Sequence, residues 1–238
     1  MEDHPPSNIS KQKGHYSWVS DFVYGGIDGA VTTFAVVAGV EGASLPISIV
    51  LIMGFANLFA DGFSMATGKY LSDKSKKEQF EKIHQIEMQH IKEKPKLEKE
   101  EIREILQHYG FGGNDLVRAT DIITSNDEHW VDLMMRNEFH LTQENIYPIK
   151  GALTTIISFM LIGFIPLIAY TFRPFLQLDN TTAFRLTALS TLFALFIVGA
   201  VKGRFTSKYW LYSGLETSFI GGLAAFIAYI VGFFLKQI

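Results

Sequence analysis

Long uncharged stretches of apolar residues dominate the pattern of this 238-residue chain. A helix needs about 20 such residues to cross the hydrocarbon core of a bilayer. Five stretches come close to this length, and they cover residues 22–40, 42–60, 151–172, 186–201 and 217–235. The pattern therefore predicts an all-α membrane protein with five transmembrane helices.

A polar segment over residues 72–147 separates the second predicted span from the third. Its amphipathic pattern predicts a continuation of the second span to about residue 91, with Pro95 as a break. Further helices are expected over residues 99–109, 114–124 and 126–141. We therefore predict a helical insert over residues 72–147, between a first part over residues 1–71 and a last part over residues 148–238.

The distribution of charge supports this division and gives an orientation. Of the 45 charged residues, 29 lie between Lys69 and Lys150, so the rest of the chain has too few to cover a soluble protein. The excess of Lys and Arg in the N-terminal tail, the insert and residues 202–208 places these parts in the cytoplasm. The absence of Cys excludes thiolate sites, and the net charge of -3 gives no reason to expect nucleic acid.

The first span contains a carboxylate, Asp28, about two turns from its start. A charge at that depth costs at least a few kcal/mol, so it should face the bundle interior or a water-filled path. Asp28 could also simply bond to a neighbouring helix. Asp21 and Thr32 share its helix face, although Asp21 could lie in the interface region. Gly25 and Gly29 form a small-xxx-small pair that favours close helix packing.

The second span carries Asn57, Asp61 and Met65 at intervals of four, and hence on one helix face. An amide oxygen, a carboxylate and a thioether together suit a borderline divalent ion such as Fe²⁺. Met65 taken alone is as well explained by packing. Near the start of the last span, Glu216 is a further candidate for a proton or metal ligand, and pairing with Lys202 or Arg204 is the alternative.

The predicted insert contains further potential ligands at helical spacing. They are Glu87 and His90, Glu98 and Glu101, and the group Met134, Met135 and Glu138. Each pair or group points one way from its helix. Such pairs are common on solvated charged faces, but two adjacent exposed Met residues beside a Glu favour metal binding.

Several motifs together resemble the vacuolar iron transporter family. They are Gly25-Gly26-Ile27-Asp28-Gly29, the segments 37–43 and 57–65, Trp130 to Glu138, Lys202 to Thr206 and Ser213 to Glu216. The resemblance implies a homodimer with five spans that exchanges cytosolic Fe²⁺, and often Mn²⁺, for protons. It assigns Asp28 and Met65 to the transport path and the seven insert residues to a cytoplasmic metal-binding domain.

Three positions depart from the pattern of that family. His90 stands where Glu is expected, Lys69 replaces a common acidic residue, and Asn57 stands where some members have Glu. Small-residue helix faces are the only support for a dimer that the sequence itself offers.

The expected mechanism is export of Fe²⁺ in which metal and proton alternately occupy Asp28 or Asp61. Fe²⁺, Mn²⁺, Zn²⁺ or Co²⁺ is expected as substrate, without a prosthetic group, in a lipid bilayer that is a bacterial inner membrane or a vacuolar-type membrane. One alternative is a membrane-anchored di-iron oxidase, because Glu81-x-x-His84 and Glu87-x-x-His90 match a di-iron element. The other is an iron sensor that binds metal without moving it.

Overall fold

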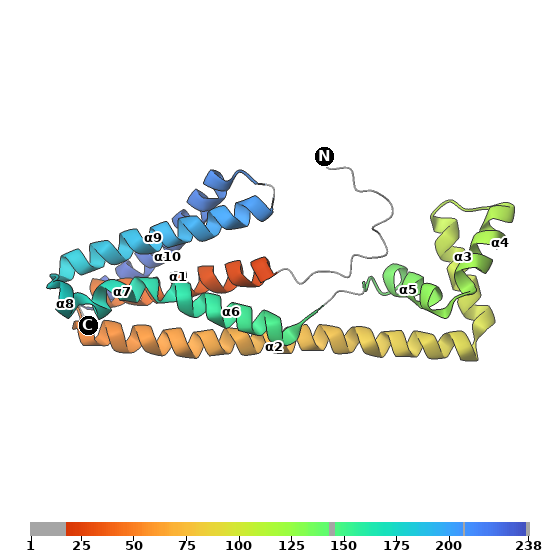
Figure 1. Ribbon diagram of the computed structural model, residues 1–238, viewed down its shortest axis with the longest axis horizontal. Helices are drawn as coiled ribbons and strands as arrows, with labels where there is room; N and C mark the ends of the chain where they lie inside the picture. The colour runs from red at the N-terminus through yellow and green to blue at the C-terminus, as the bar shows by residue number, and fades with distance from the viewer. Residues whose placement is uncertain (1–17, 143–145, 207, 237–238) are drawn as a thin grey trace. The chain divides into compact units, whose positions relative to one another are not determined.

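The computed structural model describes residues 18–142, 146–206 and 208–236, and every regular element in these ranges is a helix (Figure 1). In chain order the helices are α1 (Trp18–Gly42), α2 (Ile47–Glu93), α3 (Pro95–His108), α4 (Gly113–Thr124), α5 (Asp127–Asn137), α6 (Pro148–Gly163), α7 (Ile165–Thr171), α8 (Arg173–Leu176), α9 (Asn180–Phe205) and α10 (Trp210–Leu235). The N-terminal tail that we expect in the cytoplasm lies outside the described residues. The all-helical prediction is confirmed for the described part of the chain.

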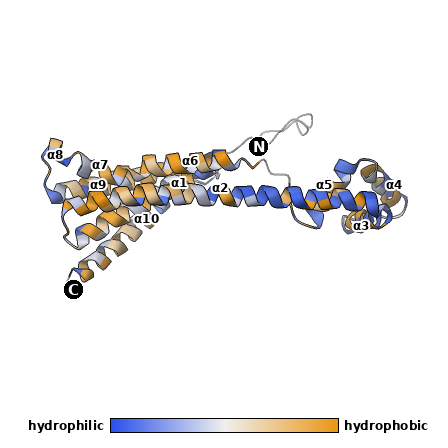
Figure 2. Ribbon diagram, turned by 90° about the horizontal axis from the view of Figure 1, so that it is seen from below, coloured by the Kyte–Doolittle hydropathy of each residue, from blue (hydrophilic) through white to orange (hydrophobic). Residues whose placement is uncertain are grey.

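The chain folds as two compact units. One contains Tyr16–Ser72 and Tyr147–Ile238, and the other is built around Asp73–Ile146. We call them the apolar unit and the polar unit, after the colours of their helices in Figure 2. Helix α2 contributes its first part to the apolar unit and its second part to the polar unit.

The helices α1, α2, α9 and α10 are long and apolar enough to cross a membrane. A fifth span exists if α6 and α7, which meet at an angle of 42°, are counted as one bent helix. The bend has a direct cause in Pro166, which has no backbone N–H to donate to the preceding turn. The predicted third span over residues 151–172 therefore corresponds to two helices with a break at Phe164.

Glycine residues allow α1 to pack tightly on two sides. A Cβ atom at Gly25 or Gly29 would meet the backbone oxygen of Thr155 or Phe159 on α6. Near its other end, α1 meets α10, where a Cβ at Gly232 would meet the backbone oxygen of Gly39. The predicted close approach at the small-xxx-small pair is confirmed, and the partner is α6 of the same chain.

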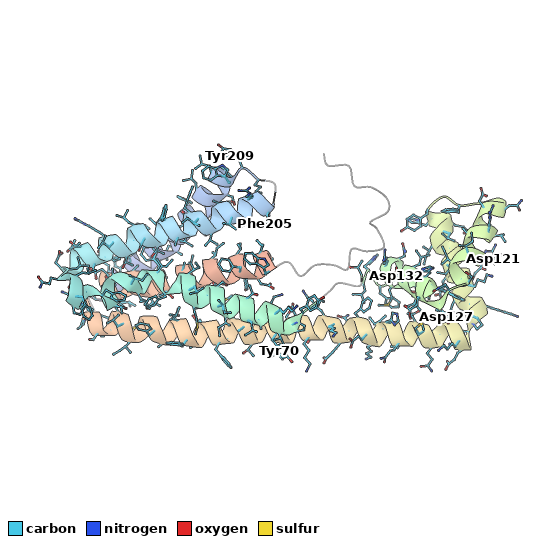
Figure 3. All side chains as sticks on the ribbon, viewed as in Figure 1. Tyr70, Asp121, Asp127, Asp132, Phe205 and Tyr209 are labelled. Atoms are coloured by element: carbon cyan, nitrogen blue, oxygen red, sulfur yellow. The ribbon has the colours of Figure 1, made fainter. Side chains whose placement is uncertain are left out.

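The apolar unit exposes many large hydrophobic side chains, as expected for a surface that faces lipid. Between α9 and α10, Phe205 and Tyr209 are 63% and 68% exposed and lie at one end of the unit (Figure 3). The neighbouring Trp210 is also exposed. Aromatic residues of this kind are enriched at the level of the lipid headgroups.

The polar unit has its own hydrophobic core, built from the second part of α2 and from α3, α4 and α5. Its buried members are Ile91, Ile102, Leu106, Leu116, Trp130, Val131, Met134 and Met135. A core of this kind lets the unit bury apolar surface without a membrane. Charged residues such as Asp121, Asp127 and Asp132 lie on α4 and α5 around it (Figure 3).

The predicted helix boundaries in the polar unit are partly wrong. Pro95 occupies the first turn of α3, where its missing N–H costs nothing, so the helix begins four residues before the predicted start. Helix α4 begins at Gly113, one residue before the predicted start, with Gly112 as its N-cap. The side chain of Asn126 caps α5 by accepting from the N–H of His129, and α5 ends at Asn137 instead of Leu141.

We predict that Gly29→Ala destabilises the apolar unit, because the added Cβ pushes against the Phe159 backbone. The expected cost is about 1–3 kcal/mol, as for other overpacked sites. The matched control is Gly68→Ala, since a Cβ added at Gly68 would have no neighbouring atom within 4 Å. In a mid-helix position that change should be neutral or should stabilise by about 0.5–1 kcal/mol. Thermal unfolding in detergent measures both, and equal midpoints for the two variants would contradict the tight α1–α6 contact.

Candidate metal-binding and transport sites

Polar side chains follow the contact between α1 and α2 in the apolar unit, and we call this contact the polar seam. It contains Asp21, Asp28 and Thr32 of α1, and Asn57, Asp61, Met65 and Lys69 of α2. Three pairs connect the helices: Lys69 with Asp21, Asp61 with Asp28, and Asn57 with Thr32. From one pair to the next, the residue number increases on α1 and decreases on α2. This order is expected for antiparallel helices joined by a short turn at residues 43–46.

The centre of the polar seam is a pair of carboxylates. Asp28 lies close enough to Asp61 for the two charges to interact, and both side chains are half-buried. One turn further along α1, Thr32 accepts a hydrogen bond of 3.4 Å from the Asn57 amide and donates to the backbone oxygen of Asp28. Two carboxylates and an amide on facing helices therefore line one short stretch of the apolar unit.

Asp28 also lines a cavity of about 520 Å³ between α1, α9 and α10. Most of the lining is apolar, and Lys202 supplies a cationic side chain. The ammonium group of Lys202 lies 4.0 Å from the carboxylate of Glu216. Of the two interpretations of Glu216, the structure therefore shows the contact with Lys202.

The ends of the polar seam differ in chemistry. Asp21 is buried and its carboxylate lies 3.2 Å from the ammonium group of Lys69, so the predicted path residue is ion-paired. Met65 is half-buried and packs against the apolar cluster that contains Val50 and Leu58. The thioether of Met65 thus has a packing role in this structure, in line with one of the two interpretations.

In the polar unit, Glu87, His90 and Glu98 form a cluster with the spacing of a metal site. One ligand atom from each residue lies within 4.8 Å of the others. The Nδ1 atom of His90 is 3.6 Å from Glu87 and 3.8 Å from Glu98. Both carboxylates are buried, and the Oε2 atom of Glu98 has no hydrogen-bond partner among the described residues. A buried, unpartnered carboxylate oxygen is expensive unless a cation or a proton compensates it.

Two more predicted ligands lie close to this cluster. Glu101 of α3 interacts with Glu87 and Glu98, and Glu138 at the end of α5 interacts with Glu87, Glu101 and His90. Five of the seven predicted insert ligands, contributed by α2, α3 and α5, therefore gather in one acidic cluster.

Burial and mutual repulsion favour the protonated form of three of these carboxyl groups, those of Glu87, Glu98 and Glu138. Burial raises the pKa of Glu98 to about 7, with further contributions from the charges of Glu101 and Glu87. Burial likewise raises the pKa of Glu87 and that of Glu138. A divalent cation would remove this repulsion, so metal binding should displace protons from the cluster.

The two Met residues of the predicted ligand set are not exposed, which corrects the expectation from sequence. Met134 and Met135 are 0% and 1% exposed and belong to the hydrophobic core of the polar unit. Helix α5 is short and uses this face to cover α2 and α3, so both sulfur atoms are buried with the apolar side chains. The last turn of α5 connects them to Glu138, whose N–H donates to the backbone oxygen of Met134.

The residues of the proposed di-iron element do not all meet. Glu87 and His90 belong to the cluster, but Glu81 lies 3.8 Å from Lys77 and His84 lies 4.0 Å from Glu128. The two Glu-x-x-His elements point in different directions because they are six residues apart on one helix. This arrangement does not favour a di-iron oxidase.

A pair at the opposite end of α1 was not predicted from the sequence. The hydroxyl group of Tyr170 in α7 donates to Glu41 at 3.4 Å, and Tyr170 is almost completely buried. Glu41 lies beside the turn that joins α1 to α2, where an acidic residue carries no special signal. Only the bend between α6 and α7 brings Tyr170 to it, and that bend was not predicted either.

Membrane-spanning helices with carboxylates between them, together with a separate acidic cluster of metal-ligand spacing, define an integral membrane protein equipped to bind cations. The model of the VIT family matches residues 19–233, and the chain belongs to this family. Vacuolar iron transporter 1 of Arabidopsis thaliana is 36% identical over 212 residues, which cover 89% of this chain and 83% of the relative. The vacuolar iron transporter of Centaurea cyanus is 34% identical, with 93% and 91% covered. That of Toxoplasma gondii is also 34% identical, with 95% and 78% covered.

We predict that the metal-free protein becomes less stable as the pH rises from the ordinary pKa of Glu, 4.5, to about 7. The folded state holds the Glu98 proton more tightly than the unfolded chain, where the ordinary pKa applies. The stabilisation is therefore complete at low pH and is lost as the pH passes through the raised pKa of about 7. Glu98→Gln should flatten this dependence, whereas Glu104→Gln, an exposed position on the same helix, should not. Thermal unfolding in the presence of a chelator measures it, and parallel pH profiles for wild type and Glu98→Gln would contradict the prediction.

Proposed function

We propose that this protein exports Fe²⁺, and secondarily Mn²⁺, from the cytoplasm in exchange for protons. The observation that carries the proposal is the pair of electrostatically interacting carboxylates, Asp28 and Asp61, on two helices able to cross a membrane. Placing a carboxylate at such depth costs free energy, so carboxylates in membrane helices typically mark an ion pathway. Membership of the VIT family, with relatives named vacuolar iron transporter, supports Fe²⁺ as the substrate.

The polar unit is the proposed loading site on the cytoplasmic side. Its cluster offers carboxylates from Glu87 and Glu98 and an imidazole from His90. Mixed oxygen and nitrogen donors suit borderline ions such as Fe²⁺, Co²⁺ and Zn²⁺ better than Mg²⁺ or Ca²⁺. Glu101 and Glu138 add negative charge nearby, which attracts cations from the cytoplasm.

Metal and protons exchange at the carboxylates of the polar seam in the proposed mechanism. Fe²⁺ binds when Asp28 and Asp61 are ionised, because two negative charges at short range then stabilise a divalent cation. Protons arriving from the other side of the membrane neutralise one carboxylate and remove a ligand, so the metal leaves. The Asn57 amide and the Met65 thioether are additional ligands of the right softness beside this pair.

A second copy of the chain is the proposed cover for the open side of the polar seam. Asp28, Asn57, Asp61 and Met65 are each only half-buried in a single chain. Polar groups at this depth do not face lipid, so protein or a water-filled path must cover them. The glycine pair of α1 does not supply that contact, because α6 of the same chain occupies it.

We predict that Asp28→Asn reduces Fe²⁺ flux in proteoliposomes at least about tenfold, because the variant lacks one of the two exchanging carboxylates. A factor of ten corresponds to about 1.4 kcal/mol. The assay imposes a pH gradient and uses a metal dye and a pH dye inside the vesicles. Asp121→Asn is the matched control, because Asp121 is exposed on α4 and pairs with Lys99. Wild-type flux in the Asp28→Asn variant would refute the mechanism. Metal binding without any flux of the wild type would instead favour the iron sensor.

We predict that Met134→Leu with Met135→Leu leaves both the fold and Fe²⁺ binding to the polar unit intact, because both sulfur atoms are buried among the apolar side chains of its core. Leu and Met have similar volumes, so a buried position tolerates the exchange at a cost of under about 1.5 kcal/mol. Met88→Leu is the control, since Met88 packs against the same core and is not one of the predicted ligands. Isothermal titration with the full chain in detergent measures the affinity, and a severalfold weaker affinity in the double variant, with Met88→Leu unchanged, would return both sulfur atoms to the ligand set.

A further inference from the structure

Lys69 is the cationic member of the seven residues that form the polar seam. It continues the stripe of Asn57, Asp61 and Met65 at the same interval of four, so it lies on the same face of α2. Its ammonium group contacts the carboxylate of Asp21 at 3.2 Å. The seam therefore contains three carboxylates, and one of them already has a cation supplied by the protein.

The two partners of this ion pair differ in their exposure to solvent. The Asp21 side chain is 12% exposed and that of Lys69 is 26% exposed, so the carboxylate is the more buried partner. A buried carboxylate is costly without a cation, whereas a Lys side chain with its long methylene stem reaches water easily. Asp21 therefore requires a counter-ion, and Lys69 is not the only ion able to serve.

We propose that Lys69 is an internal competitor for metal: its ammonium group occupies Asp21 and must leave before a divalent cation binds at this end of the polar seam. The inference rests on the proposed function in that the seam is taken as the transport path. It goes further by assigning to Lys69 the control of metal occupancy at Asp21, seven residues before Asp28 on the same face of α1.

The competition has a simple electrostatic consequence. While Lys69 is bound, its charge offsets that of Asp21 and this end of the seam does not retain a divalent ion, so an incoming ion passes toward Asp28 and Asp61. When Lys69 is replaced by a neutral residue, the Asp21 carboxylate loses that cation and binds metal itself. The lysine thus weakens binding at this end and prevents the ion from being held there.

The test measures binding, so that it does not depend on transport. Co²⁺ is titrated into the purified full chain in detergent, in a background of Glu87→Gln and Glu98→Gln that disables the cluster of the polar unit. Lys69→Gln should tighten Co²⁺ binding about tenfold, the scale expected when one charge is removed beside a partly buried site. Lys69→Arg should bind like the parent because it retains the charge.

A double-mutant cycle shows whether Asp21 is the site of competition. Adding Asp21→Asn to Lys69→Gln should return the affinity to that of the parent. Lys77→Gln is the matched control, because Lys77 lies on the same helix and pairs with Glu81, and it should change nothing. Unchanged or weaker Co²⁺ binding in Lys69→Gln, or equal tightening with and without Asp21, would overturn the proposal.

Thermal unfolding keeps the inference testable if Lys69→Gln proves less stable. In chelator its midpoint should fall below that of the parent, and Co²⁺ should then raise it by more than it raises the parent's midpoint. An equal or smaller increase contradicts competition. Flux of the wild type is measured in parallel: a protein that moves no metal would refute the proposed transport, while the binding cycle still decides the role of Lys69.

Discussion

The constraint on which the apolar unit depends is the cost of a charge between apolar helices. Asp21, Asp28 and Asp61 all lie on helices able to cross a membrane; across the α1–α2 contact Lys69 offsets the charge of Asp21, whereas Asp28 and Asp61 repel each other. The short turn at residues 43–46 fixes the register of the two antiparallel helices, so a single geometric fact decides which polar residues meet. Tight packing of α1 on α6 then holds one side of the seam in place.

The polar unit meets the same constraint in a different way. Its carboxylates gather at the surface of a small hydrophobic core, where α2, α3 and α5 converge, and the core that holds them also contains Met134 and Met135. The positions of Glu87 and Glu98 therefore depend on apolar packing as much as on charge. The raised pKa of Glu98, about 7, expresses the cost of that placement in the absence of a cation.

The sequence predicts the membrane helices and the face shared by Asn57, Asp61 and Met65, because both depend on local periodicity. The pairing of Asp28 with Asp61 was accessible as well, since a turn as short as residues 43–46 leaves little freedom of register. The bend at Phe164 was missed although Pro166 is its signal in the sequence, because a Pro inside an otherwise helical run kinks or ends the helix. The burial of Met134 and Met135 was not predictable from α5 alone, because it depends on which face of that helix covers α2 and α3.

The packing of α1 differs sharply from that of α2. In the apolar stretch of α1, 56% of the residues are buried, and glycine contacts join the helix to α6 on one side and to α10 on another. In the apolar stretch of α2, only 22% of the residues are buried. Backbone contacts at glycine leave α1 no slack for sliding. We therefore expect α1 to act as a stationary wall of the path, which keeps the Asp28 carboxylate at a fixed depth.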